Sequence, residues 1–376
     1  MGVNLLAALG ERFGADTLAA ARRDAEARGH RLVRTDAADG RLEAWIDWRF
    51  APSWWSSEAH AGSAWFALRA DAIAGFAAFG ARDLPFPWLR TYRGRDEIGI
   101  FGPYGVVPED RGTGIGRALL NAALCSLAER HPAALIPAVN DERLCELYLR
   151  RAGAHVADQF SYDVPRARAV LLASGDGTNV QNVIDGVAAG EIALDVLAVI
   201  ANAADAPVLE RARTAGIAAD AVVWDRKAEP RSAYDARLIV ALERYDPELV
   251  LLLGWMHLVP QAFLDRFPET LNTHPAFLPF DPRADEVTMP DGTRIPAFRG
   301  AHAPRDAFAA GVRWAGVTAH RVTAAADRGE VLVRTPLSFH RDIGSGERLH
   351  KLLKHLEYAA VPKAIRRWGL ERAARA

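Results

Sequence analysis

An asparagine and a histidine, Asn272 and His274, stand one residue apart where an apolar stretch ends in LNTHPAFLP. In an extended strand, residues i and i+2 project from the same face, so the two side chains would point the same way. The amide nitrogen of one and a ring nitrogen of the other can each donate a hydrogen bond. Two donors aimed at one point can hold the negative charge that develops on a carbonyl oxygen under attack. Taken alone, the pair is more simply explained as the polar end of a strand before a loop.

A Gly-rich turn is the second candidate for chemistry. Residues 111–116 read RGTGIG and lie between a strand-like segment at 97–107 and a helical pattern at 117–130. Glycines in such a turn allow backbone N–H groups to face an anion, and the start of the following helix adds partial positive charge. A pyrophosphate would fit there, although a tight strand–helix turn without a ligand has the same composition.

Composition narrows the class of protein. The chain has 376 residues, of which 50% are hydrophobic and 25% charged, with a net charge of −1. This length is typical of two domains, and a net charge near zero indicates neither a nucleic-acid nor an acidic-membrane partner. The two cysteines, Cys125 and Cys145, predict no disulfide framework, and the histidines lack the close spacing of a metal site. No apolar run has membrane-spanning length, and no basic segment precedes the apolar N-terminus, so we expect a cytoplasmic protein.

The N-terminal half has the pattern of a mixed α/β domain. Five tryptophans fall within residues 45–65, and two strand-like runs, 63–71 and 72–82, are close enough to form a hairpin. The other expected elements of this half are helices at 14–29 and 141–153 and strands at 134–139, 155–160 and 161–164.

From about residue 166 the pattern changes to strands that alternate with helices. Continuous apolar strands of this kind suit a parallel sheet that is covered on both faces and joined by right-handed crossovers. Ligands of such sheets bind beyond the carboxyl ends of the strands, where LNTHP lies. The change divides the chain into domains at 1–165 and 166–376, with the first forty residues unassigned. The expected strands are 168–174, 195–202, 221–224 and 248–255, and the expected helices are 179–190, 206–216 and 232–245.

The N-terminal half resembles the GNAT-type N-acetyltransferases over about residues 40–164. The resemblance rests on RGTGIG between a strand and a helix, on the two valines before it, and on the later segment NDERLCELYLRRAGA. It implies acetyl-CoA as cofactor and Tyr148 as general acid toward the leaving CoA thiolate. The Trp-rich stretch would lie where this family builds its acceptor site, with ordinary core packing as the alternative. The residues that the resemblance assigns to the cofactor are Val106, Val107, Arg111, Gly112, Gly114, Gly116, Arg117 and Asn140.

The C-terminal half is similar to the glycinamide ribonucleotide formyltransferases, folate-dependent enzymes of purine synthesis, over residues 168–368. The main matching segments are ASGDGTNVQNVID, LNTHPAFLP, GVTAHRVTAAADRG and HLEYAAVP. The resemblance implies 10-formyltetrahydrofolate as formyl donor and Asn272, His274 and Asp327 as catalytic residues. Asn272 and a protonated His274 would hold the charge on the formyl oxygen. Asp327 would keep His274 charged and relay the proton that the amine loses, and His320 would support it.

The same resemblance assigns binding residues. The SGDGTN turn would hold a ribose phosphate at a helix start; a dinucleotide loop is the rival interpretation, but the full G-x-G-x-x-G spacing is lacking. For Glu357 the alternative is a solvated helix charge, and for Met256 it is core packing. The residues assigned to the substrate are Gly177, Thr178, Asn179 and Glu357, and those assigned to the folate are Met256, His257 and Val259.

The sequence departs from this family pattern in three places. Extra chain, at about 280–298, separates LNTHP from the family's next Gly-x-His element. Gly300 and His302 correspond to that element. The PDGT segment of the extra chain has turn chemistry and predicts a small hairpin or flap beside the active site, and the insertion could reshape the amine pocket. Phe280 stands in the place of a family lysine, and Arg328 in the place of the first glycine of Asp-Gly-Gly.

Together these features predict an α/β protein, with a GNAT-like mixed α/β domain followed by a Rossmann-like formyltransferase domain with a mainly parallel sheet. We expect a 10-formyltetrahydrofolate-dependent N-formyltransferase acting on a small-molecule primary amine, with glycinamide ribonucleotide as the first candidate, fused to an acetyl-CoA-dependent N-acetyltransferase. Two alternatives remain. One is a bifunctional enzyme that formylates and acetylates a different amine, and the other is a GNAT half that binds CoA without catalysis. The oligomeric state and the acetyl acceptor stay open.

Overall fold

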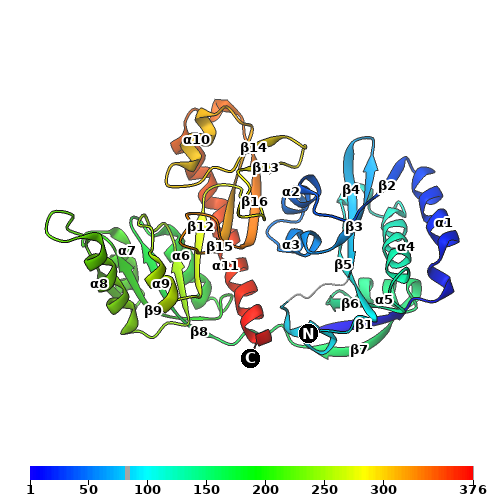
Figure 1. Cartoon of the computed structure of the whole chain (residues 1–376), viewed down its shortest axis with the longest axis horizontal. Coiled ribbons are helices and arrows are strands. Elements are labelled where there is room, and N and C mark those ends of the chain that lie inside the picture. Colours follow the sequence, from blue (N-terminus) through cyan, green and yellow to red (C-terminus); the bar gives the residue numbers. More distant parts are fainter. Residues whose placement is uncertain (81–84, 376) are drawn as a thin grey trace. The chain divides into compact units, whose positions relative to one another are not determined.

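The computed structural model describes residues 1–80 and 85–375 of the chain. Within these residues the chain divides into two compact units, each built around its own sheet (Figure 1). The first unit consists of Met1–Phe50 and Trp55–Asp163, and the residues from Leu370 onward group with it. The second consists of Ala51–Trp54 and Val164–Gly369.

The first unit contains a seven-stranded sheet in which neighbouring strands are antiparallel, except for one parallel pair, β5 and β6. In spatial order the strands are β2 (His30–Thr35), β3 (Ser63–Arg69), β4 (Ala72–Gly80), β5 (Ile98–Val106), β6 (Ala133–Val139), β1 (Gly2–Ala8) and β7 (His155–Phe160). The helices are α1 (Ala15–Glu26), α2 (Gly40–Arg49), α3 (Trp55–His60), α4 (Ile115–Ala128) and α5 (Glu142–Arg151), with short 3-10 turns at Glu11–Phe13, Pro87–Tyr92 and Pro108–Asp110.

Strand β1 was not indicated by the sequence. It lies inside the sheet, antiparallel to both β6 and β7. The buried Asn4 side chain fixes it there by donating to the Trp88 carbonyl oxygen at 2.7 Å and to Asp158 Oδ1 at 2.8 Å. Its partners are distant in sequence, so no local pattern could reveal the pairing.

Of the strands expected in this unit, one is wrong and one extends beyond the described residues. The expected strand at 161–164 is absent, because the chain leaves the sheet after β7. The strand expected at 72–82 is described as far as Gly80, and its last two residues lie outside the described part of the chain.

Strands β5 and β6 separate partway along their length. Only Ile98, Gly99 and Ile100 of β5 pair with β6, although β5 continues to Val106. Beyond Ile100 the facing backbone N–H and C=O groups of β5 and β6 therefore form no ladder hydrogen bonds with each other. Because β5 leads directly into the RGTGIG turn, the separation opens toward that turn.

The second unit contains a second seven-stranded sheet. In spatial order the strands are β10 (Ala218–Ala221), β9 (Leu194–Ala201), β8 (Ala167–Ala173), β11 (Leu249–Leu252), β12 (Thr270–His274), β15 (Trp314–Arg321) and β16 (Val331–Ser338). The first five strands are parallel to one another, and the sixth, β15, runs antiparallel to both of its neighbours, β12 and β16. The helices are α6 (Thr178–Ala188), α7 (Pro207–Thr214), α8 (Arg231–Glu243), α9 (Gln261–Arg266), α10 (Ala303–Ala309) and α11 (Gly346–Arg375), with a 3-10 turn at Arg341–Ile343.

Helices cover both faces of this sheet. Successive side chains of a strand point to opposite faces, so Leu171 and Leu251 pack with α6, α7 and α11, whereas Leu172 and Leu252 pack with α8 and α9. This two-sided burial explains why the strands read as continuous apolar runs rather than as an alternating pattern.

Strand β10 is corrected relative to the sequence. The β-branched segment at 221–224 was expected to form it, but the strand is Ala218–Ala221, in parallel register with β9. The Val222 amide makes the last hydrogen bond to this neighbour, at 2.8 Å from the Ala201 carbonyl oxygen, and Val223 is 45% exposed. Pairing with β9 has overridden the local β-propensity.

The hairpin predicted from PDGT is present. Strands β13 (Glu286–Thr288) and β14 (Arg294–Pro296) form a separate two-stranded antiparallel sheet, with Glu286 opposite Pro296 and Thr288 opposite Arg294. Three of its side chains, Val287, Met289 and Ile295, are buried.

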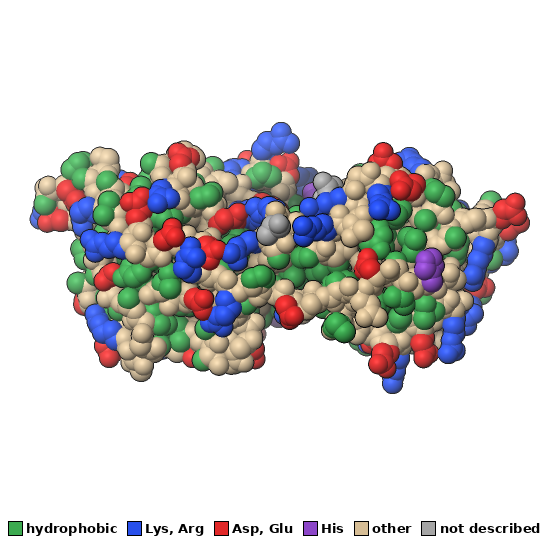
Figure 2. Space-filling view, turned by 90° about the horizontal axis from the view of Figure 1, so that it is seen from below, with side chains coloured by type: hydrophobic (Ala, Val, Ile, Leu, Met, Phe, Trp, Pro, Cys, Tyr) green, Lys and Arg blue, Asp and Glu red, His purple; other side chains and the backbone are tan. Residues whose placement is uncertain are grey.

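The surface carries both signs of charge. On the face drawn in Figure 2, Lys and Arg side chains are interspersed with Asp and Glu, in keeping with a net charge of −1. Among the described residues, no helix is both long and apolar enough to cross a membrane. The same residues contain no group of three or more His, Cys, Asp or Glu side chains that could hold a metal ion.

Candidate active site

The polar pair of LNTHP lies on β12, between β11 and β15. Asn272 and His274 share one face of this strand, and in β15 they lie opposite His320 and Thr318. Thr273 points to the other face, where its buried hydroxyl has no partner among the described residues. The two faces of one short strand therefore differ in chemistry.

His274 has both ring nitrogens close to oxygen atoms. Nε2 lies 2.8 Å from the Phe298 carbonyl oxygen, and Nδ1 lies 3.5 Å from Asp327 Oδ2. Only the doubly protonated ring can donate to both. Burial lowers the pKa of His274, while Asp327 and the Phe298 carbonyl act to raise it, and burial prevails. The charged His274 expected from the sequence would thus need further negative charge nearby, such as an oxyanion.

Asp327 lies in the loop between β15 and β16 with φ at 54°, a left-handed conformation that Asp and Asn tolerate better than most residues. Its carboxylate lies between two imidazoles, with Oδ2 3.5 Å from His274 Nδ1 and Oδ1 3.6 Å from His320 Nε2. Oδ2 also accepts the Gly300 amide at 2.7 Å. Burial opposes ionisation, but the neighbouring imidazoles of His320 and His274 and the Gly300 amide together hold the pKa of Asp327 well below its usual range. The group is therefore a carboxylate at neutral pH.

His320 connects Asn272 with Asp327. Its Nδ1 lies 2.7 Å from the Arg321 carbonyl oxygen, so we assign the ring hydrogen to this nitrogen. Nε2 can then accept from Asn272 Nδ2 at 3.3 Å, which orients the amide. The Asn272 nitrogen carries a second hydrogen, and this hydrogen is the donor that an oxyanion could receive. Asn272, His274 and Asp327 are thus brought together around one point, with His320 behind them.

The assigned substrate residues lie where β8 ends and α6 begins. Gly177 precedes the helix with φ at 68°, and Thr178 is its first residue. Asn179 Nδ2 donates to Glu357 Oε2 of α11 at 2.6 Å, and both side chains are buried. Burial raises the pKa of Glu357, and the Asn179 hydrogen bond opposes the rise. Asn179 Oδ1 is buried without a partner among the described residues. An unsatisfied acceptor and a buried carboxyl beside a helix start suit a ligand with an amine or hydroxyl donor and a phosphate.

The residues assigned to the folate form the loop after β11. Met256 is 58% exposed, whereas Val259 is buried. His257 has Nδ1 3.0 Å from the Tyr234 hydroxyl and Nε2 3.2 Å from Asn202 Nδ2. Burial and two nearby arginines lower its pKa. The His257 ring is enclosed by the aromatic rings of Trp224, Tyr234 and Trp255.

In the first unit, the RGTGIG turn joins β5 to α4. Gly112 and Gly114 have φ at 78° and 93°, values that favour glycine. Gly116 is required for another reason, because a Cβ there would lie 2.3 Å from the Tyr104 hydroxyl oxygen. Burial raises the pKa of Tyr104 to about 12. The first amide of α4, that of Ile115, donates to Thr113 Oγ1 at 3.4 Å, and a helix start of this kind is suited to an anion.

The other residues assigned to acetyl-CoA lie at the end of β5, in the turn, at the start of α4 and after β6. Arg111 Nε donates to the Val106 carbonyl oxygen at 3.1 Å, and Arg117 pairs with Asp24 at 3.2 Å. Val107 is buried, and Asn140 is exposed just before α5. The sequence did not single out Arg28, whose Nε lies 3.0 Å from the position of a Cβ on Gly114. Arg28 comes from a segment far from the motif, so only the fold reveals it.

Tyr148, assigned as general acid, lies on α5 and is 4% exposed. Its ring meets Phe101 edge-on, with centroids 5.8 Å apart. Burial and the neighbouring Tyr104 raise the pKa of Tyr148. A phenol in this position stays protonated at neutral pH, but it is enclosed in the apolar core.

Comparison with known proteins decides the family. Residues 167–282 and 293–365, together half of the chain, match the Formyl transferase family. The chain belongs to the formyl transferase family. Residues 28–154 match the Acetyltransferase (GNAT) family. The chain therefore carries a GNAT domain followed by a formyl transferase domain.

The relatives point to one branch of the formyl transferase family. The chain is 36% identical over 166 residues to phosphoribosylglycinamide formyltransferase of Escherichia coli (strain K12), covering 44% of this chain and 70% of that protein. It is 35% identical over 205 residues to the protein of the same name from Mycobacterium tuberculosis (strain ATCC 25618 / H37Rv), covering 53% and 83%. A solved structure of glycinamide ribonucleotide transformylase 1 from Symbiobacterium toebii is 37% identical, covers 54% of this chain and 88% of that chain, and has a TM-score of 0.47.

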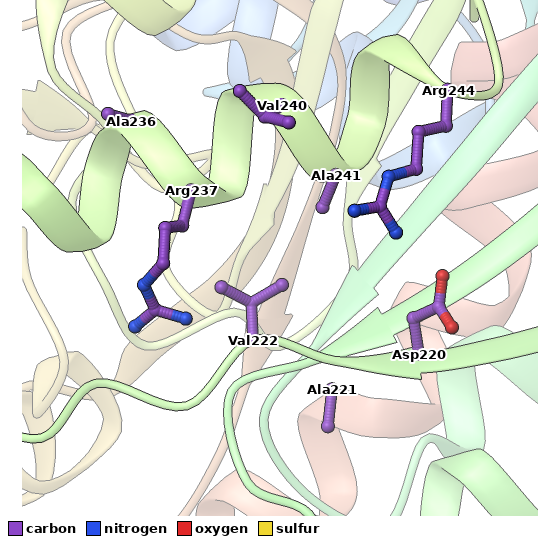
Figure 3. Close-up of a pocket in the computed structure, with 8 residues that line it drawn as sticks. All are labelled: Asp220, Ala221, Val222, Ala236, Arg237, Val240, Ala241 and Arg244. Carbon is purple, nitrogen blue, oxygen red and sulfur yellow. The ribbon is translucent and has the colours of Figure 1, made fainter.

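A hollow at the edge of the formyl transferase sheet has a different character. It has a volume of about 400 Å³ and lies between β10 and α8, bordered by Asp220, Arg237 and Arg244 around Val222 and Val240 (Figure 3). It shares no residue with the Asn272–His274–Asp327 group. Arg237 already pairs with Glu229. The hollow is therefore separate from that group of polar side chains.

Gly177→Ala is expected to destabilise the formyl transferase domain. A Cβ there would lie 2.2 Å from Val208 Cγ2 and would also take a left-handed φ. Gly190 has a similar φ of 75° but open space around it, so Gly190→Ala isolates the backbone cost. We expect Gly177→Ala to lower the free energy of unfolding by about 1–3 kcal/mol more than Gly190→Ala, the usual cost of overpacking. Urea unfolding of the two variants measures the difference, and equal values would contradict the expected steric conflict.

Proposed function

We propose that this chain transfers a formyl group from 10-formyltetrahydrofolate to a small primary amine, with glycinamide ribonucleotide as the first candidate. The observation that carries the proposal is the convergence of Asn272, His274 and Asp327, two potential donors and a carboxylate, around one point at the end of β12. The relatives named phosphoribosylglycinamide formyltransferase support the same substrate.

The bound folate would supply an electrophilic formyl carbon on a leaving nitrogen. The amine nitrogen forms a bond to this carbon, and negative charge grows on the formyl oxygen. Asn272 Nδ2 and the protonated His274 ring then hold that oxygen. For His274 to do so, its Nε2 must exchange the Phe298 carbonyl for the substrate oxygen. Asp327 stabilises the imidazolium and receives the amine proton, which returns to the leaving nitrogen as the carbon–nitrogen bond breaks.

The amine pocket of this proposal is the start of α6. A phosphate would bind the amides after Gly177, while Glu357 and Asn179 would bind the donors of the glycinamide portion. Met256 and Val259, with His257 between them, would border the folate. The exposed Met256 fits a surface that a ligand covers better than the core packing considered from the sequence.

We propose that the GNAT domain binds acetyl-CoA through the RGTGIG turn and the separated strands β5 and β6. In a catalytic domain, Tyr148 would protonate the CoA thiolate. The burial of Tyr148 against Phe101 favours the second candidate function, a CoA-binding domain without acetyl transfer. Acetylation of any amine in a panel, abolished by Tyr148→Phe, would rule out that second candidate.

Release of tetrahydrofolate, followed by absorbance, tests the formyl transfer. Purified protein is mixed with 10-formyltetrahydrofolate and glycinamide ribonucleotide. Rapid release that needs both compounds and Asn272 is the expected result. If the folate binds but no tetrahydrofolate is released, the formyl-transfer mechanism is retained and the amine is a different one. This result would favour the alternative of a bifunctional enzyme that formylates and acetylates another amine. Absence of folate binding would overturn the proposal.

Arg111→Glu is expected to weaken acetyl-CoA binding by at least about tenfold, because a carboxylate would face the phosphates at the turn that now holds a guanidinium. Calorimetric titration with acetyl-CoA measures the change. Arg130→Glu, just beyond the other end of α4, serves as the matched control and should leave affinity within about twofold. Formyl transfer should stay unchanged in both variants. A fall in formyl transfer with Arg111→Glu alone would instead indicate communication between the domains.

A further inference from the structure

Strand β13 and the turn that follows it are an addition to the formyl transferase family, whereas β14 lies within a family segment. The two family segments end at residue 282 and resume at 293, so residues 283–292 lie outside both. Asp285 belongs to this addition, and its side chain is 76% exposed. The Ala297 amide donates to the Asp285 carbonyl oxygen at 2.9 Å, so the base of the hairpin is closed at this residue.

The Asp285 carboxylate binds two arginines. Oδ1 lies 2.6 Å from Arg328 Nη2 and 3.2 Å from Arg299 Nη1. Each guanidinium also binds a carbonyl oxygen of the same stretch: Arg328 Nη1 donates to Pro282 at 2.7 Å and Arg299 Nη2 to Ala284 at 2.7 Å. Arg328 occupies the place of a family glycine. Asp285, which the family lacks, is therefore hydrogen-bonded to Arg328, which replaces a family glycine.

Both arginines belong to segments that hold Asp327. Arg328 is the next residue in the chain, and Arg299 Nε donates to the Asp327 carbonyl oxygen at 3.2 Å. Arg299 also precedes Gly300, whose amide donates to Asp327 Oδ2 at 2.7 Å. Asp285 is thus connected to the Asp327 carboxylate in two ways. One runs through Arg328 and the backbone of the Asp327 loop, and the other through Arg299 and the Gly300 amide.

We propose that Asp285 is a positioning residue for formyl transfer, which through Arg299 and Arg328 holds Asp327 against His274. The proposal rests on the proposed formyl transfer. A left-handed non-glycine residue persists only where its surroundings determine it, and Asp327 has this conformation. Asp285 itself contacts no reacting atom in this role.

The arrangement has an electrostatic side. His274 faces Asp327, His320, Arg299 and the Phe298 carbonyl, and Arg299 acts to lower its pKa. Asp285 offsets the charge of both guanidiniums. Without it, the positive charge of Arg299 would act on His274 with less compensation, so its imidazolium would become harder to form.

If Asp285 had a purely structural role, its removal would change the rate of formyl transfer only by destabilising the fold. An exposed ion pair contributes about 0–1 kcal/mol to stability, so removing Asp285 should barely change unfolding. A displacement of about 1 Å at a reacting group can cost on the order of 10²-fold in rate. Loss of rate without loss of stability therefore identifies a positioning role.

The test compares full-length Asp285→Asn with Glu286→Gln, which removes the neighbouring carboxylate paired with Arg294. We expect Asp285→Asn to lower kcat at least about tenfold, with a similar KM and an unchanged unfolding midpoint. Glu286→Gln should change kcat less than about twofold. In the Arg328→Gly background, Asp285→Asn should cost less than in the wild type, because one of its two routes to Asp327 is gone. Equal rates for Asp285→Asn and Glu286→Gln would overturn the proposal.

A second measurement does not depend on turnover. The His274 ring is titrated by NMR in the resting protein, where Asp285→Asn should shift its titration to lower pH and Glu286→Gln should not. If the wild type transfers no formyl group, the proposed function fails, and this titration alone decides whether Asp285 acts on the His274–Asp327 pair. An unchanged His274 titration in Asp285→Asn would exclude that action.

Discussion

Asn272→Ala is expected to lower the rate of formyl transfer by about 10²–10³-fold, the usual cost of losing one donor to a developing oxyanion. The substitution removes the amide that His320 orients at 3.3 Å. Because the donor is needed most when charge has formed, kcat should fall much more than KM rises. Single-turnover kinetics with 10-formyltetrahydrofolate and the amine measure the effect.

Thr273→Val is the matched control for this variant. Thr273 lies on the same strand but on its other face, and its buried hydroxyl has no partner among the described residues. Replacing that hydroxyl with a methyl group should leave both rate and stability nearly unchanged. A rate within about threefold of wild type in Asn272→Ala would remove the oxyanion role from the mechanism.

Asp327→Asn is expected to lower formyl transfer by about 10²–10⁴-fold, because an amide can neither receive the amine proton nor stabilise the His274 imidazolium. Asparagine tolerates the left-handed conformation at φ 54°, so the loop should keep its shape. Asp327 is one of the influences that raise the pKa of His274, and its loss should lower that pKa further. The fraction of charged His274 would then fall at every pH near neutrality. The pH dependence of kcat and the NMR titration of His274 measure the two consequences.

Asp246→Asn is the control for this second prediction. Asp246 also has a positive φ, 43°, but it lies on the surface and pairs with Arg168. It should keep wild-type kinetics, which would show that an Asp-to-Asn change at a left-handed position is harmless by itself. Normal turnover in Asp327→Asn would mean that another group accepts the proton.

The candidate site could be predicted in part because its first two members obey a local rule. The period of a strand alone puts Asn272 and His274 on one face. Asp327 could be assigned only through the family resemblance, since nothing local connects it to β12. The glycine pattern of its loop also has a physical reason. A Cβ at Gly329 would lie 1.6 Å from the Arg321 carbonyl oxygen, so that glycine is required. Arg328 is not among the residues with positive φ, so an arginine is accepted there.

The features that the sequence did not predict depend on partners far away in the chain. Strand β10 consists of four residues with weak β-propensity, Ala218–Ala221, because its position is set by pairing with β9. The role of Asp285 depends on two arginines, Arg299 and Arg328, that come close only after three loops have folded together. Strand β1 lacks a local signal for the same reason. Patterns of period 2 or 3.6 describe what a segment can form, and long-range contacts decide what it joins.

The position of β1 also has a consequence for the time course of synthesis. Asn4 and its partner Asp158 are separated by 154 residues. At about 5–20 residues per second, the ribosome needs on the order of ten seconds to make the chain between them. For most of that interval β1 has neither of its neighbours, since β6 ends at Val139 and β7 begins at His155, and the sheet of the GNAT domain is completed only after β7 emerges. Slowing translation between residues 9 and 132 would lengthen the time in which this apolar strand is available to chaperones.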